Sequence, residues 1–465
     1  MSKSDIIAIY DKSPKIAVLE STFAARQKSQ MTGLVGSSLS FVANSLFKKS
    51  ELPFLILFSN KEEAAYYLND LEQLINTEDV LFYPSSYRRP YQIEETDNAN
   101  VLLRAEVLNR INSRKKPAII VSYAEAIFEK VVTRKELEKN TLKLSVGDNL
   151  SIDFINETLF EYNFKRVDFV TEPGEFSVRG GIIDVFSFSN DNPYRIEFFG
   201  NEVDSIRSFD VETQLSVEKL KKISIIPNVE NKLLQENRES FLDYINEKTV
   251  LVIQNTELLG QQLDKLFDKA NEAFEKLSKD IQHTKPEELF LNQKQFLKRA
   301  LDFSVIELHA NAVFKIDKKV EFHMQPQPSF NKQFDLLLNN LSENHFNGYK
   351  NYLCCSNENQ ASRFHDIFED IDEANHESIR KQYKTMVLPL FEGFIDEENQ
   401  IACYTDHQIF ERYHKFSIKN GYSKKQTITL KELTSLSVGD YVTHIDHGIG
   451  KFGGLQKIQV EGKTQ

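Results

Sequence analysis

Short apolar runs alternate with amphipathic helical patterns along the first 140 residues of the chain. LPFLILFS (52–59) and KPAIIVSY (116–123) have the length and character of buried strands, whereas KEEAAYYLNDLEQLI (61–75) repeats its apolar positions at the helical spacing. This alternation is typical of βαβ units arranged around a parallel sheet. The pattern therefore predicts the first part of an α/β domain over residues 1–140.

The pattern changes to strands and turns between residues 141 and 227. GGIIDVFSFS is followed by the turn Asp191-Asn192-Pro193, the strand YRIEFF and a second turn at Gly200-Asn201. Helices and strands alternate again over residues 228–325, where KTVLVIQN predicts a buried strand and ELLGQQLDKLFDKANEAFEKLSKDI a long amphipathic helix. We therefore expect one α/β domain that is split by a β-rich module.

The rest of the chain predicts a small third domain and the beginning of a barrel. QPQPSFN (325–331) is a proline-containing connector, and residues 328–420 have α/β patterning that includes KNYLCCSNENQASRFHDIF. A polar linker over 421–434 leads to residues 435–465, where strand patterns begin but too few accumulate to close a barrel. We expect this last domain to be truncated.

Composition limits the classes of function. A length of 465 residues suggests several domains, and 40% hydrophobic with 27% charged residues allows packed cores without disulfides. The absence of a secretory leader and of a long apolar run predicts a cytoplasmic protein without a membrane partner. A net charge of −12 favours protein partners over general nucleic-acid binding. Three cysteines, Cys354, Cys355 and Cys403, lack metal-binding spacing and are expected to be structural.

MTGLVGSSLSFVANSLF (31–47) has the outline of a phosphate-binding loop between a strand and a helix. Leu39 occupies the position of the lysine that balances the nucleotide phosphates in a Walker A motif. We predict a degenerate, non-functional phosphate loop, and a simple helix-capping turn is the alternative. The loop comprises Gly33, Gly36, Ser37, Ser38, Leu39 and Ser40.

Other candidate sites are weaker. In VTHIDHGIG, His444 and His447 would point to opposite faces of an extended segment, so we expect no metal there despite Asp446. SYRRPYQ, with Arg88 and Arg89, has a basic and aromatic composition but favours a solvated surface turn over phosphate contact. No catalytic triad, GxSxG or HExxH pattern occurs, so the sequence predicts no catalytic residue, metal or cofactor for this chain.

Three side chains in the β-rich module have the composition of a protein-binding site. In YRIEFF, Ile196 and Phe198 share one face, while Arg195 and Phe199 share the other with Glu197. Arg179 precedes Gly180-Gly181, where a partner can approach closely. Arginine beside an exposed aromatic ring is typical of binding hot spots. The alternative is that the arginines only pair within their own sheet, with Glu197, Glu202 or Asp204.

The run from PGEFSVRGGIIDVF through YRIEFFGNEVDSIRSFD resembles a module that the excision-repair protein UvrB and the transcription-repair coupling factors (the Mfd family) use to bind UvrA. Position by position, the resemblance implies that Arg179, Arg195 and Phe199 contact UvrA. Leu39, and the lack of a DNA-clamping hairpin after SSYRRPY, favour the coupling factors over UvrB. GDYVTHIDHGIGKFGGL is also similar to the start of their RNA-polymerase-interacting domain, an SH3- or Tudor-like barrel.

The resemblance implies a multidomain α/β fold: a UvrB-like degenerate P-loop domain split by the UvrA-binding module, a small α/β domain and a truncated barrel. It implies recruitment of UvrA to stalled RNA polymerase, whose β subunit would contact the barrel, with Ile458 as the candidate residue. ATP, magnesium and double-stranded DNA would engage a translocase motor that is absent from this chain, so we expect this N-terminal part not to be an enzyme. We also expect the UvrA surface to be exposed, because the family's autoinhibitory C-terminal domain is missing. The alternative function is a UvrB-like damage-loading ATPase.

Overall fold

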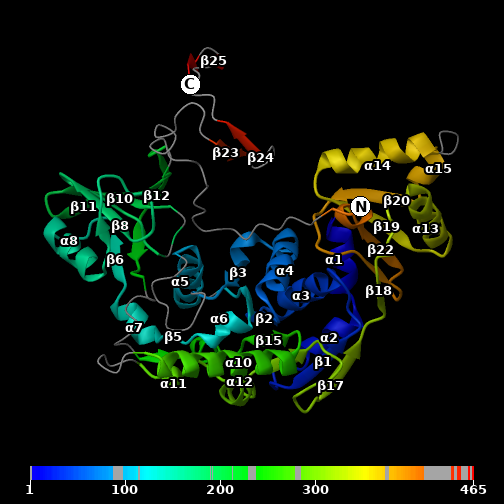
Figure 1. Ribbon diagram of the computed structural model, residues 1–465, viewed down its shortest axis with the longest axis horizontal. Helices are drawn as coiled ribbons and strands as arrows, with labels where there is room; N and C mark the ends of the chain where they lie inside the picture. Colours follow the sequence, from blue (N-terminus) through cyan, green and yellow to red (C-terminus); the bar gives the residue numbers. More distant parts are fainter. Residues whose placement is uncertain are drawn as a thin grey trace. The chain divides into compact units, whose positions relative to one another are not determined.

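The computed structural model divides the chain into two compact units, residues 1–421 and 422–465, and each is considered by itself (Figure 1). The ranges that the structure describes are 3–86, 98–113, 116–188, 190, 192–211, 213–228, 237–277, 284–371, 376–412, 441–444, 448–451, 459–460 and 463–464.

A parallel sheet of seven strands, in the order β17-β1-β16-β15-β2-β4-β3, organises the first unit. Strands that precede and strands that follow the β-rich segment both belong to it, since β15 pairs with β2 on one side and with β16 on the other. The chain therefore leaves this sheet after β4 and returns to it at β15. The strands are β1 (Lys28–Thr32), β2 (Phe54–Phe58), β3 (Val80–Tyr83), β4 (Ile119–Tyr123), β15 (Val250–Ile253), β16 (Ser304–Glu307) and β17 (Lys318–Glu321).

Helices cover this sheet, and several begin at an asparagine that caps them. Every residue of β2 and β15 is buried, as expected for strands covered on both faces. Asn60, Asn255 and Asn292 each accept a hydrogen bond from a backbone amide in the first turn of the helix that follows. The helices are α1 (Lys3–Asp11), α2 (Pro14–Glu20), α3 (Ser38–Ser50), α4 (Lys61–Leu74), α5 (Asn98–Ser113), α6 (Ala124–Phe128), α9 (Phe241–Tyr244), α10 (Thr256–Glu275), α11 (Pro286–Leu289) and α12 (Gln293–Ala300).

The β-rich module is a six-stranded sheet, in the order β12-β11-β10-β9-β8-β7, with a core of its own. Phe176, Ile183 and Ile196 point from the sheet into this core, where α8 (Ile152–Glu161) adds Ile155 and Leu159. The strands are β7 (Lys165–Arg166), β8 (Glu175–Arg179), β9 (Ile182–Val185), β10 (Tyr194–Phe199), β11 (Glu202–Phe209) and β12 (Ser216–Leu220). A two-stranded ribbon of β6 (Leu142–Ser145) and β13 (Lys222–Ile225) forms where the chain enters and leaves the module.

A third α/β segment follows, with a five-stranded sheet in the order β18-β21-β22-β19-β20 (Figure 1). Cys354, Cys355 and Cys403 are buried free thiols on its central strands, as the sequence predicts. Part of this segment packs into the core of the first sheet, because Phe394 lies edge-on to Phe41 of α3. Its elements are β18 (Met324–Pro326), α13 (Phe334–Phe346), β19 (Lys350–Cys355), α14 (Glu358–Ile371), α15 (His376–Arg380), β20 (Tyr383–Val387), β21 (Phe394–Asp396), β22 (Ile401–Thr405) and α16 (Asp406–Ile409).

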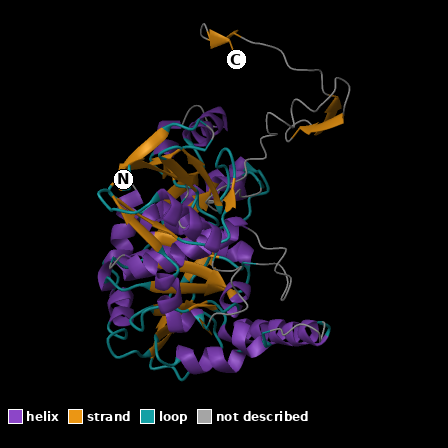
Figure 2. Ribbon diagram, turned by 90° about the vertical axis from the view of Figure 1, so that its left-hand side faces the viewer, coloured by secondary structure: helices purple, strands orange, loops and turns teal. Residues whose placement is uncertain are grey.

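Among its described residues, the second unit has two short antiparallel pairs, β23 (Tyr441–His444) with β24 (Gly448–Lys451), and β25 (Gln459–Val460) with β26 (Lys463–Thr464). Ile458, Asp446 and His447 lie outside the described residues, as do Arg88 and Arg89 of the first unit. A mixed α/β fold with a parallel sheet and a β-rich region is confirmed (Figure 2). Within the described ranges, no helix has the length and apolar character needed to cross a membrane.

Candidate functional site

Asp184 is the structural centre of the predicted interaction site. It lies on β9 between β8 and β10, and the register sets Arg195 directly opposite it. Arg195 donates from Nε to Oδ1 of Asp184 at 2.7 Å and from Nη2 to Oδ2 at 2.8 Å. Arg179, one diagonal step away on β8, donates from its own Nη2 to the same Oδ2. One carboxylate therefore holds both arginines on the face opposite the module's core.

Both arginines do pair within their own sheet, as the alternative predicted, but their shared partner is Asp184 and not Glu197, Glu202 or Asp204. Glu197 instead pairs with Arg207 and accepts a hydrogen bond from the Ser205 hydroxyl at 2.6 Å. The hydrogen bonds that Arg195 donates to Asp184 raise the pKa of Arg195 further above its usual value, so its charge is permanent.

The three predicted residues differ in how far they reach solvent. Phe199 is 84% exposed, a large value for a phenylalanine. The side chain of Arg179 is 43% exposed and that of Arg195 only 17%, whereas the side chain of Asp184 beneath them is 1% exposed. The ring and one guanidinium are thus open to a partner, and the second guanidinium is partly covered.

Aromatic rings fix the planes of both guanidiniums. The Arg195 guanidinium carbon lies 4.5 Å from the ring centroid of Phe209, which is buried. The Arg179 guanidinium carbon lies 5.3 Å from the ring of Phe169, which is 60% exposed. Such contacts contribute about 0.5–1 kcal/mol at exposed positions, and they reduce the number of orientations that each guanidinium samples. Phe169 extends the exposed aromatic surface beside Arg179.

Two tight turns place these side chains. Gly180 has a φ of +59°, and a Cβ on Gly181 would lie 3.1 Å from the Phe198 carbonyl oxygen, so the β8–β9 turn allows close approach of β10. Phe198 completes this contact by donating its amide to the Gly181 carbonyl at 2.8 Å. Phe199 is the last residue of β10, immediately before Gly200 with a φ of +64°. Its ring is therefore presented at the end of a hairpin.

The sequence patterns alone indicated no role for Asp184, Phe169 or Phe209. The signal for Asp184 was present: it is an acidic residue within the apolar run GGIIDVF, where a buried carboxylate requires a cationic partner. No local pattern marks Phe169, which meets Arg179 through the fold.

The residues of the predicted degenerate phosphate loop lie together between β1 and α3. Gly33 and Gly36 have φ values of +77° and +53°, Ser37 is the N-cap of α3, and Leu39 is buried in the first turn. Ser38 Oγ donates to the Val35 carbonyl at 2.7 Å, which closes the turn. The strand-turn-helix outline is present, and its inability to bind nucleotide stays a prediction.

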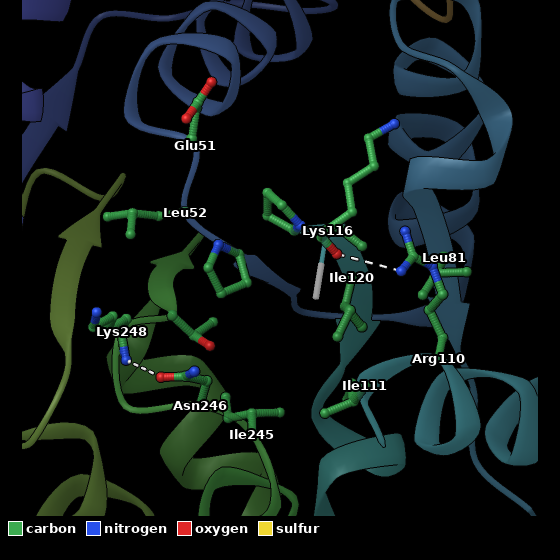
Figure 3. Close-up of a pocket in the computed structure, with 14 residues that line it drawn as sticks. Glu51, Leu52, Leu81, Arg110, Ile111, Lys116, Ile120, Ile245, Asn246 and Lys248 are labelled. Atoms are coloured by element: carbon green, nitrogen blue, oxygen red, sulfur yellow. Dashed lines mark hydrogen bonds between the residues drawn. The ribbon is translucent and has the colours of Figure 1, made fainter. Parts of the chain in front are cut away.

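A cavity of about 290 Å³ lies at the opposite edge of the same sheet (Figure 3). Its walls include Leu52, Ile120 and Ile245, and it is bordered by residues that precede β2, β4 and β15. Arg110 and Lys116 at its border both pair with Asp79. The cavity is therefore at the amino ends of the strands, away from the turn that follows β1.

Residues 142–230 match the UvrB interaction domain, and residues 436–465 match the CarD-like/TRCF RID domain. The chain thus contains one segment similar to each of these two domain families.

The chain is similar to proteins named transcription-repair-coupling factor over most of its length. The protein of Bacillus subtilis is 24% identical over 93% of this chain, that of Staphylococcus epidermidis 22% over 92%, and that of Haemophilus influenzae 22% over 83%. The chain spans about two fifths of the length of these relatives, 42%, 42% and 39%. The resemblance predicted from the sequence is confirmed.

Proposed function

We propose that this chain acts in transcription-coupled nucleotide excision repair by recruiting UvrA through the surface formed by Arg179, Arg195 and Phe199. The match to the UvrB interaction domain and the similarity to transcription-repair-coupling factors support this role. The observation that carries the assignment to these residues is the arginine pair fixed on Asp184 beside an exposed Phe199.

The geometry suits an acidic and apolar partner surface. The exposed guanidinium of Arg179 has further N–H groups available for a carboxylate of the partner. Because Arg195 is held at both Nε and Nη2, association would cost it little conformational entropy. Phe199 projects from the hairpin end and would fill an apolar pocket of the partner, as central aromatic anchors do.

RNA polymerase is the second proposed partner. The match of residues 436–465 to the CarD-like/TRCF RID domain supports it. The finer assignment of the polymerase β subunit, with Ile458 as contact, remains a proposal. ATP hydrolysis, magnesium binding and movement along double-stranded DNA are proposed only for the whole protein.

Measuring UvrA affinity by isothermal titration calorimetry tests the main proposal. We expect Arg179→Ala and Arg195→Ala to weaken binding about ten- to hundredfold each, because charge-assisted hydrogen bonds contribute roughly 1.5–3 kcal/mol. Phe199→Ala should weaken binding comparably. Phe346→Ala is a matched control, since Phe346 is 90% exposed but lies on α13, outside the module. Unchanged affinity in all three module variants would remove the assignment.

The alternative of a UvrB-like damage-loading ATPase makes a different prediction. Titration of the intact chain with ATP and magnesium should then give saturable heat at micromolar nucleotide. We expect none, because Leu39 supplies no charge to the phosphates.

A further inference from the structure

The turn between β1 and α3 is covered by a distant segment of the same chain. Residues 391–393, from the loop between β20 and β21, lie on it. The Ser37 amide donates to the Glu392 carbonyl oxygen at 3.1 Å, and the Glu392 amide donates back to Ser37 Oγ at 3.0 Å. A backbone carbonyl oxygen thus accepts a hydrogen bond at the start of a helix. In a nucleotide-binding loop, a phosphate oxygen accepts at this position.

Helix α4 forms the other wall of this contact. Tyr66 stacks on Phe391 with ring centroids 3.9 Å apart, and Tyr67 meets the same ring edge-on at 6.5 Å. Asp70, fully buried one turn further along, accepts the Phe391 amide on Oδ1 at 2.8 Å. Tyr67 also donates its hydroxyl to the Gly36 carbonyl at 3.2 Å. The same helical face therefore holds both the turn and the segment that lies on it.

The glycines of the turn are explained by close approach of other backbone segments, residues 392–393 at Gly36 and Phe322 at Gly33. A Cβ on Gly36 would lie 2.8 Å from the Gly393 carbonyl oxygen and 2.9 Å from Cβ of Glu392. A Cβ on Gly33 would lie 1.8 Å from the carbonyl oxygen of Phe322, just beyond β17. Both positions are closed to any side chain by the chain's own backbone, so the glycines are required with no nucleotide present.

We propose that this glycine- and serine-rich turn is a docking site whose resident ligand is the main chain of residues 391–393. The third α/β segment occupies the place that nucleotide phosphates would take and is coupled to the first sheet through it. This assigns a role to a segment for which the sequence implied none. The proposal stands on the contacts of the turn and does not depend on UvrA binding.

Hydrogen exchange measured by mass spectrometry on the intact chain tests this docking. We expect peptides covering 33–40 and 388–394 both to be protected, since the amides of Ser37, Phe391 and Glu392 are donors in the contact. Phe391→Ala removes the stacked ring and should accelerate exchange in both peptides by a similar factor, about tenfold. Phe346→Ala, the same change at an exposed site of the same segment, should alter neither.

Acceleration confined to 388–394, or no acceleration in either peptide, would overturn the proposal. A second variant, Leu39→Lys, restores the missing cation. If residues 391–393 occupy the turn, the Leu39→Lys variant should bind no ATP-magnesium, or should bind it only when peptide 388–394 loses its protection from exchange. Saturable binding with that peptide still protected would show that nucleotide and segment do not share the site. Should this variant fail to fold, because Leu39 is buried, the exchange experiment alone decides.

Discussion

Replacing Asp184 with asparagine tests whether one buried carboxylate organises the proposed UvrA site. The substitution keeps the shape of the side chain but removes its charge. It also places an NH₂ group among guanidinium donors. Arg195 loses two charge-assisted hydrogen bonds in a largely covered position. Removing one partner of a buried pair costs about 3–5 kcal/mol. Losing the pairing with Arg179 adds less than about 1 kcal/mol to this cost, because the Arg179 side chain is 43% exposed and screened by water. We expect a local loss of about 3 kcal/mol.

Two measurements on Asp184→Asn separate folding from binding. Because the chain has several domains, global unfolding is not a two-state process, and hydrogen exchange of β9 and β10 amides reports the stability of the module directly. Titration with UvrA should show affinity lowered about tenfold, since Arg195 must be ordered on association. In this background, Arg195→Ala should cost less than it does in the wild type, as expected for coupled residues.

Asp79→Asn is a matched control for this variant. Asp79 is also a buried carboxylate between two cations, Arg110 and Lys116, but it lies in the first sheet's domain. It should lower stability comparably and leave UvrA affinity unchanged. The reasoning is refuted if Arg179→Ala and Arg195→Ala weaken UvrA binding while Asp184→Asn does not, because the arginines would then function without the carboxylate.

Three further changes probe the first unit. Burial raises the pKa of Asp70 from 3.8 to about 7, so the folded state binds this proton more tightly than the unfolded state. The free energy of unfolding therefore falls as pH rises from about 4 to about 7. Asp70→Asn should remove up to roughly 4 kcal/mol of this pH dependence, so that a plot of melting temperature against pH becomes flatter. Gly36→Ala should lower the melting temperature by several degrees more than Gly147→Ala, since both have positive φ but only Gly36 faces backbone within 3 Å; equal effects would contradict this. Glu129→Gln breaks the buried ion pair with Arg104 and should lower local stability by about 3 kcal/mol, measured by hydrogen exchange around Ser86. The control Glu136→Gln, at a partly exposed ion pair, should lower stability by less than about 0.5 kcal/mol.

Local patterns in the sequence predicted the elements well. Apolar runs became the buried strands β2, β4 and β15, because a strand covered on both faces needs apolar residues throughout. Alternation in YRIEFF correctly separated buried Ile196 from the arginine face. These features depend on neighbours a few residues apart, where periodicity is informative.

Such local patterns could not predict contacts between segments that are far apart in the sequence. Asp184 and Arg195 are eleven residues apart, and only the strand register sets them opposite one another. Glu392 lies 355 positions from Ser37, and no spacing rule links them. The sequence predicted which residues were chemically unusual, but the fold decides which of them meet.

The turn at residues 33–40 shows why a motif outline alone is ambiguous. A helix amino terminus offers unpaired N–H groups that donate to either a phosphate oxygen or a peptide carbonyl oxygen, and glycines allow either ligand to approach. The discriminating residue is the lysine, because a triphosphate brings several negative charges and a neutral carbonyl brings none. Leu39 fits the neutral ligand, since its side chain is buried in the same apolar core as Phe41 and Phe394. Gly36 and the uncharged Leu39 therefore both fit the proposed docking of residues 391–393, whereas Gly33 makes room for the Phe322 carbonyl.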